Sequence, residues 1–273
     1  MEPAFALQKA TKRYRRADGS WNAALEEVDL EFRPGESVAV IGPSGAGKTT
    51  LFRLLSLTLR PDEGRVLVDG ADPAELGGRA LRRLRSRTAT IHQQHNLIPS
   101  LRAVHNILAG RLAVWSFPRA LLSLALPREV RRAAEAAEKV GLLDKLWERT
   151  DRLSGGEQQR VAAARAIVQN ARHILADEPV ASVDPSRADA LITLLRRMSE
   201  EDGKTLIVNL HDVPLALRHF PRIVGLHANG VLFDLPPKAI EEGLLAYLYE
   251  EEEASAMEAR GWINKAAAPG RGS

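Results

Sequence analysis

Residues 42–49 of the sequence read Gly-Pro-Ser-Gly-Ala-Gly-Lys-Thr, the pattern of a loop that binds phosphate groups. Glycines let the backbone wrap closely around phosphate oxygens, with N–H groups directed inward. Lys48 would add a positive charge beside the β- and γ-phosphates, and the Thr49 hydroxyl would bind Mg²⁺. An apolar run over residues 37–41 precedes the loop, and a helical pattern over residues 51–58 follows it. This context predicts a nucleotide site rather than a glycine-rich turn before an ordinary helix.

A second motif, Leu-Ser-Gly-Gly-Glu-Gln-Gln-Arg at residues 153–160, precedes the apolar helical stretch 161–168. Gly and Ser at the start of a helix form a further anion site. Two carboxylates, Asp177 and Glu178, directly follow an apolar strand, at the strand end where α/β sheets place their ligands. An isolated Asp-Glu pair would be read as a solvated surface pair, but this one accompanies both glycine-rich motifs. Together the three motifs resemble those of the ATP-binding cassette (ABC) ATPases.

The resemblance implies an ATPase that uses ATP and Mg²⁺, and it implies roles for individual residues. Asp177 would support Mg²⁺, and Glu178 would be the general base that polarises the attacking water. His211, which closely follows an apolar strand, would reach the γ-phosphate. Gln93 would contact Mg²⁺ or water, although the adjacent Gln94 leaves a one-residue alternative.

Two further positions gain a role from the resemblance. Tyr14 would stack on adenine, where the alternative is a core aromatic near a strand end, and Asp184 would lie at a dimer interface. His92 stands where the family usually has an aromatic residue, a departure that affects local packing more than chemistry. The predicted catalytic residues are Glu178, His211 and Lys48, and the predicted metal ligands are Thr49, Gln93 and Asp177. The predicted nucleotide-binding residues are Tyr14, Gly42, Pro43, Ser44, Gly45, Ala46, Gly47, Lys48, Thr49, Thr50, Gln93, Ser154, Gly155, Gly156, Glu157 and Asp184.

Within the family, the sequence is most similar to the ATPases of phosphonate importers. The segments that carry this similarity lie at residues 108–111, 127–129, 176–182 and 222–226, with a weaker contribution from 244–249. ABC subunits for amino acids and for lipoproteins share some of these segments, so an importer for another solute, such as an amino acid, is the alternative. An ABC-like subunit of a phosphonate-degrading complex is a second alternative. A DNA-repair or translation factor of the family is disfavoured, because it would carry paired cassettes, zinc-binding cysteines or long coiled coils.

The resemblance also implies partners. Two copies would form a homodimer through the ATP sites, with Ser154, Gly155 and Gly156 of one copy contacting the ATP held by the other. Transmembrane permease subunits would bind the dimer, a solute-binding protein would act indirectly, and nucleic acid would not be a partner. The apolar residues Trp115 and Phe117 would either contact the permease or pack the local core. The chain would lie peripherally on the cytoplasmic face of the inner (plasma) membrane.

The order of apolar runs and helical patterns predicts an α/β fold with a largely parallel sheet. We expect strands near residues 37–41, 64–70, 88–91, 173–176, 205–209, 222–226 and 231–234, the last two forming a hairpin. The expected fold is a P-loop NTPase core of the ABC ATPase type with an inserted helical subdomain and a small antiparallel β portion. The expected ATPase domain spans residues 4–248, with the core at 4–92 and 160–235 and the helical subdomain at 95–159. Residues 249–273 would be an acidic, flexible tail.

Composition narrows the remaining possibilities. The chain has 273 residues, with 38 Lys and Arg against 35 Asp and Glu, and this small surplus does not argue for nucleic acid. The absence of cysteine excludes disulfides and thiolate metal sites. No signal peptide is visible, and the longest apolar-rich run, residues 112–126, is too short to cross a bilayer. We therefore expect a soluble, cytoplasmic protein.

Overall fold

A six-stranded sheet forms the centre of the computed structural model, which describes residues 2–92, 96–181 and 184–250. Its strand order is β5 (Thr88–His92), β6 (His173–Asp177), β7 (Thr205–Asn209), β3 (Ser37–Ile41), β8 (Arg222–His227) and β9 (Gly230–Leu235). The first five strands are parallel, and β9 pairs antiparallel with β8 as the expected hairpin. Every residue of β3 and β7 is buried, because both faces of the sheet are covered.

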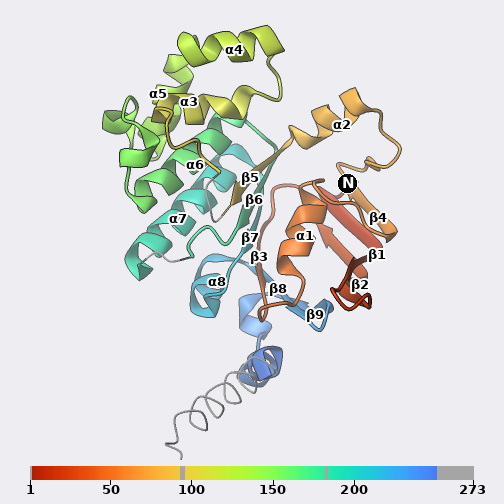
Figure 1. Cartoon of the computed structure of the whole chain (residues 1–273). Helices are drawn as coiled ribbons and strands as arrows, with labels where there is room; N and C mark the ends of the chain where they lie inside the picture. Colours follow the sequence, from red (N-terminus) through yellow and green to blue (C-terminus); the bar gives the residue numbers. More distant parts are fainter. Residues whose placement is uncertain (1, 93–95, 182–183, 251–273) are drawn as a thin grey trace, which may run out of the picture.

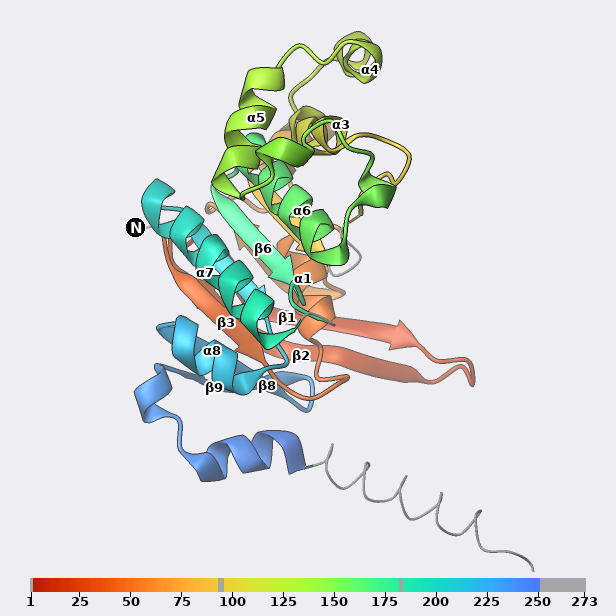
Figure 2. The ribbon, with the colours of Figure 1, turned by 90° about the vertical axis from the view of Figure 1, so that its left-hand side faces the viewer.

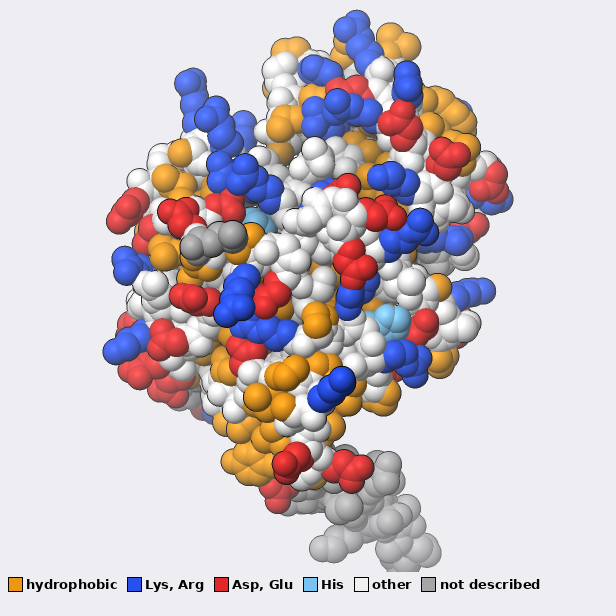
Figure 3. All heavy atoms as spheres, turned by 180° about the vertical axis from the view of Figure 1, so that it is seen from behind, with side chains coloured by type: hydrophobic (Ala, Val, Ile, Leu, Met, Phe, Trp, Pro, Cys, Tyr) orange, Lys and Arg blue, Asp and Glu red, His pale blue; other side chains and the backbone are white. Residues whose placement is uncertain are grey.

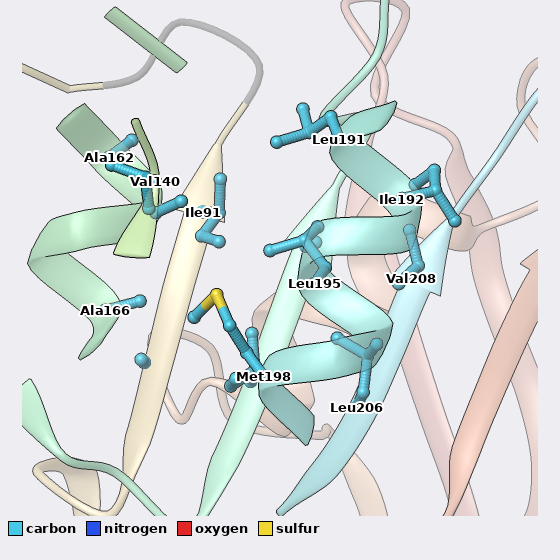
Figure 4. Packing of buried hydrophobic residues seen from close by; sticks show 14 of the residues in the cluster. Ile91, Val140, Ala162, Ala166, Leu191, Ile192, Leu195, Met198, Leu206 and Val208 are labelled. Atoms are coloured by element: carbon cyan, nitrogen blue, oxygen red, sulfur yellow. The ribbon is translucent and has the colours of Figure 1, made fainter. Parts of the chain in front are cut away.

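Helices cover one face of this sheet (Figures 1 and 2). They include α6 (Gly155–Gln169), α7 (Pro185–Asp202) and α8 (Val213–His219). Ile91, Leu206 and Val208 of the sheet pack in one apolar cluster with Leu195 and Met198 of α7 (Figure 4). The alternate residues of the strands pack on the opposite face, against α1 (Lys48–Leu55) and a second sheet. This layering fixes the strands firmly, so the loops at their ends have a rigid support.

The second sheet is antiparallel and has the order β2 (Trp21–Phe32), β1 (Phe5–Arg15) and β4 (Glu63–Val68). It is the small antiparallel portion that the resemblance implies, although the apolar pattern alone indicates only β4. Lys9 and Glu27 adopt positive φ angles of 47° and 45°, and the β1–β2 register shifts at residues 7–13. These irregularities break the regular alternation of apolar and polar residues by which a strand is recognised.

A helical region is inserted between β5 and β6. It contains α3 (Ala103–Leu108), α4 (Phe117–Ala125), α5 (Val130–Lys139) and the 3₁₀ turns Ala109–Arg111, Leu143–Lys145 and Thr150–Arg152, and α6 leads back to the sheet. On α5, Ala133 and Ala137 are buried, and Gly141 follows the helix with a φ of 65°. In both ribbon views α4 lies at the tip of this region, away from the two sheets (Figures 1 and 2).

The helix after the phosphate loop is shorter than expected. It was expected to continue to Thr58, but α1 ends at Leu55 because Leu57 adopts a φ of 59°, a left-handed conformation that ends the helix. The remaining helix, α2 (Gly78–Arg85), carries the clustered arginines of this region. Residues 242–250 are helical, with Leu248 buried, and the rest of the expected tail lies outside the described residues. No helix in the described ranges is long and apolar enough to span a membrane.

Candidate nucleotide site

The loop between β3 and α1, residues 42–47, has the backbone of a phosphate cradle. Gly42, Gly45 and Gly47 have φ angles of 150°, 84° and 95°. A Cβ atom on Gly42 would lie 2.2 Å from the carbonyl oxygen of Leu226, and one on Gly47 would lie 2.2 Å from that of Ala24. Only glycine satisfies both the backbone conformation and the close approach of neighbouring backbone. The loop conformation is therefore enforced by its surroundings.

Lys48, the first residue of α1, is placed by this loop. Its side chain is 5% exposed, and its Nζ donates to the carbonyl oxygens of Gly42 and Pro43 at 2.6 and 2.8 Å. The ammonium group is thus held at the loop while the Thr49 side chain is exposed beside it. No side chain caps the start of α1, so its first N–H groups face the loop. This arrangement suits an anion.

The two carboxylates predicted to act on the nucleotide lie at the end of β6: Asp177 is its last residue, and Glu178 follows it. The Nδ2 group of Asn209, at the end of β7, donates to Oδ1 of Asp177 at 2.8 Å. Glu178 has a φ of 51°, and its Oε1 lies 2.7 Å from Nε2 of His211. Adjacent carboxylates thereby have different partners. Asn209 is fully buried and is not among the predicted site residues; a polar residue at the end of an apolar strand was the signal that could have indicated it.

The sheet brings these groups to one edge. Strands β6, β7 and β3 are consecutive neighbours and run parallel, so their C-terminal ends lie side by side. The phosphate loop follows β3, the carboxylates end β6, and His211 follows β7. The described structure thus gathers Lys48, Asp177, Glu178 and His211 along a single edge, the place where α/β sheets bind their ligands.

The strand next to β6 contributes His92. It lies opposite Asp177 in the β5–β6 register, and burial lowers the pKa of its imidazole, while the Asp177 carboxylate opposes that shift. Gln93 and Gln94, between which the sequence did not decide, lie outside the described residues, so their predicted role stays a prediction.

The second motif forms the start of α6. The Oγ atom of Ser154 accepts a hydrogen bond from the N–H group of Glu157 at 3.3 Å, and the Glu157 carboxylate accepts from the N–H of Ser154 at 2.8 Å. The bond from this N–H group, with a second one from the Ser154 hydroxyl, lowers the pKa of Glu157. Gly155 and Gly156 complete the first turn. Glu157 therefore already has a structural role in capping the helix.

A groove of about 480 Å³ beside this motif lies between α6 and α7. Its lining includes Ser154, Gly156 and Glu157 but no residue of the phosphate loop. Gln159 is a further buried residue that is not among the predicted site residues. Its Nε2 donates to the carbonyl oxygen of Pro179 at 2.8 Å. That bond ties α6 to the segment that follows the two carboxylates.

Asp184 and Tyr14 lie on other elements. Asp184 caps the start of α7: hydrogen bonds from the Ser186 hydroxyl, at 2.7 Å, and from the N–H of Arg187 lower the pKa of its carboxyl group. Residues 182–183, which precede it, lie outside the described residues. Tyr14 is 36% exposed near the end of β1, opposite Asn22 of β2, so the ring is not a core aromatic.

Comparison with known proteins gives the following similarities. A model of the ABC transporter family matches residues 25–181. A Pseudomonas aeruginosa protein named phosphonates import ATP-binding protein PhnC 1 is 45% identical over 243 residues, which cover 89% of this chain and 90% of that protein. An Anaeromyxobacter dehalogenans protein named phosphonates import ATP-binding protein PhnC is also 45% identical, over 94% of this chain; the chain spans about half of that protein's length.

Solved structures agree with the fold. A dimeric ATP-binding cassette in a post-hydrolysis state, bound to ADP and Pi, superposes with a TM-score of 0.74 at 31% identity, covering 86% of this chain and all of that chain. A cassette from a Clostridium perfringens transporter complex gives the same TM-score at 24% identity and bears on the fold alone. The predicted α/β fold and the resemblance carried by the motifs are confirmed.

Proposed function

The chain belongs to the ABC transporter family, and we propose that it is the ATP-hydrolysing subunit of an importer for phosphonate or a related phosphorus oxyanion. The assignment as an ATPase is supported by one observation: the phosphate loop, Asp177, Glu178 and His211 lie together at one edge of the sheet. The phosphonate part rests on relatives that are 45% identical over most of the chain. An amino-acid importer remains the second candidate from sequence, and no feature of the described residues favours it.

Each residue at the edge has a role in this proposal. The loop N–H groups and Lys48 bind the phosphates, the Tyr14 ring stacks on adenine, and Glu178 takes a proton from the attacking water. His211 contacts the Glu178 carboxylate in this structure, and we propose that it also contacts the γ-phosphate when ATP is bound. The 2.7 Å separation of these two side chains supports a common site for them.

The residues at the edge fit a Mg²⁺ ion that accompanies the nucleotide. Among the described residues, no group of three or more His, Cys, Asp or Glu side chains could hold a metal ion by itself. A Mg²⁺ ion at a nucleotide, however, needs only one or two protein ligands, because phosphates and water supply the others. Thr49 and Asp177 would hold the ion, with Gln93 as the further predicted ligand. When bound, it neutralises charge that develops on the phosphates. Asn209 fixes Asp177 for this task through the 2.8 Å hydrogen bond.

We further propose that two copies share each ATP site. The groove beside Ser154 and Gly156 contains no residue of its own phosphate loop, which supports an anion from another copy as its occupant. Asp184 would then lie at the interface. Replacing Ser154 and Ser44 by cysteine tests this, since both side chains are exposed. A disulfide between opposite chains that forms only with ATP supports sharing, and its absence in proven dimers contradicts it.

Permease subunits would bind the dimer at the cytoplasmic face of the membrane, and a solute-binding protein would deliver the solute to the permease. The test is uptake into vesicles that contain this chain with its permease and binding protein. Alkylphosphonate or phosphite should enter in an ATP-dependent way, without competition from excess amino acids. Transport of an amino acid instead would overturn the solute assignment and leave the ATPase proposal intact.

A further inference from the structure

The exposed side of α4 is apolar, which is unusual for a helix at the tip of a protein. Phe117 is 81% exposed, Leu121 60% and Leu122 39%, and Leu126 just beyond the helix is 63% exposed. Phe117 and Leu121 are four residues apart and therefore lie on the same side of the helix. The sequence left open whether Phe117 packs in a core or lies at a surface; the structure places it at the surface.

The surrounding segment, residues 111–132, is strongly basic. It contains five arginines, at positions 111, 119, 128, 131 and 132, and one acid, Glu129, so its net charge is 5 − 1 = +4. The Glu129 carboxylate is already used: it accepts from Nε1 of Trp115 at 3.3 Å and pairs with Arg111, Arg119 and Arg132. No acidic side chain of this segment is left to face outward.

The same contacts hold the segment in place. Glu129, at the start of α5, joins Trp115, Arg111 before α4 and Arg119 on α4, and the Arg119 guanidinium lies 5.4 Å from the Trp115 ring centre. The apolar side of α4 is therefore presented by a fixed structure. A groove of about 370 Å³ beside it is lined by Trp115, Leu122 and Leu126, with Arg119 and Arg128 also on its wall.

We propose that residues 111–132 dock on an anionic phospholipid surface. Phe117, Leu121 and Leu126 would enter the boundary between headgroups and acyl chains, and Arg128 would pair with a lipid phosphate. Charge complementarity carries this choice of partner, because the segment has a net charge of +4. Arg131 is paired with Glu135 of α5 at 2.9 Å, whereas Arg128 takes part in none of the ion pairs of the described residues. The shape agrees: α4 projects from the molecule (Figures 1 and 2), and hydrophobic and basic side chains meet at that end (Figure 3).

The test is flotation of the purified chain with protein-free vesicles. Vesicles of phosphatidylcholine mixed with phosphatidylglycerol should carry the chain upward, vesicles of phosphatidylcholine alone should not, and added salt should reduce the binding. Phe117→Ser should lower the partition coefficient about tenfold. Arg128→Gln should lower it about fivefold, as expected for one basic residue near the surface.

Two control variants make the same kinds of substitution at exposed positions outside the proposed docking segment. Leu143→Ser removes an apolar side chain that is 47% exposed in the same helical region, and Arg79→Gln removes an exposed arginine of α2. Both should bind the mixed vesicles like the unchanged chain, and all four variants should keep its melting temperature and ATP turnover. Equal binding to neutral vesicles, or equal losses in the controls, overturns the proposal. So does binding that appears only when permease subunits are in the vesicles, which would identify a protein partner.

Discussion

Replacing Glu178 by glutamine separates proton transfer from every other property of the proposed site. The amide has the shape of the carboxylate, and its Oε1 still accepts a hydrogen bond from Nε2 of His211 at the observed 2.7 Å. The φ of 51° at this position should be kept, since glutamate and glutamine both carry a Cβ atom and pay the same backbone cost there. The variant should therefore keep the fold, the Asp177–Asn209 bond and ATP affinity within about threefold, because the phosphate loop is unchanged.

The expected loss lies in turnover alone. A positioned general base contributes about 10²–10⁴-fold to rate, so ATP turnover should fall by that factor. This corresponds to about 3–5 kcal/mol in activation free energy. Phosphate release at saturating ATP measures turnover, and equilibrium titration with a fluorescent ATP analogue measures affinity. ATP-bound dimers should accumulate in the variant, which gel filtration with ATP detects.

The chain offers a matched control in a second pair of a carboxylate and a histidine. Asp189 Oδ1 lies 2.8 Å from Nε2 of His219, away from the sheet edge. Asp189→Asn should change turnover less than about twofold, as surface substitutions do. If Glu178→Gln turns ATP over like the unchanged chain, Glu178 is not the base. If Asp189→Asn is equally inactive, the loss reflects general damage and the argument fails.

Three further outcomes are expected. Lys48→Ala should weaken ATP binding at least about tenfold in titration, because a charged donor to phosphate is lost; unchanged affinity and turnover would remove the lysine from the site. Asn209→Leu should raise the Mg²⁺ concentration for half-maximal turnover about tenfold, since Asp177 loses the donor that orients it; an unshifted Mg²⁺ dependence would contradict this. His173 is 3% exposed beside Asp69, and burial lowers the pKa of the imidazole despite that carboxylate. The unfolded chain thus binds a proton near pH 6.5 that the folded chain resists, so stability should fall below that pH by up to about 1.4 kcal/mol per unit. In denaturant titrations at pH 7.5 and 5.5 His173→Gln should show a smaller fall, and an equal fall would refute the assignment.

Much of the fold could be predicted from local patterns. Strands β3 and β7 are continuous apolar runs because both of their faces are buried. The turn residues at Asn229 predict the β8–β9 hairpin. The phosphate loop was equally predictable, since Gly42 and Gly47 are required by close backbone contacts with Leu226 and Ala24. Such features depend on a few neighbouring residues, so the sequence displays them directly.

Other features depend on partners far along the chain. Asn209 acts through Asp177, 32 residues away, and Gln159 acts through Pro179, 20 residues away. Neither contact is visible until β6 and β7 are known to be neighbours and α6 to cover them. Strand β1 was missed for a different reason. Lys9 has a positive φ, and the register shift beside it interrupts the regular alternation of apolar and polar residues along the strand.

The different environments of Asp177 and Glu178 arise from a single backbone change. Asp177 is the last residue in the β6 register, so its side chain remains beside the neighbouring strand and meets Asn209. Glu178 then turns into the left-handed region at a φ of 51°, a conformation that is unfavourable for a residue with a Cβ atom, and its carboxylate meets His211 instead. Two adjacent carboxylates in regular strand geometry would point to opposite faces of the sheet. The turn directs both to the same edge with different partners, which is what a division between holding a metal and accepting a proton requires.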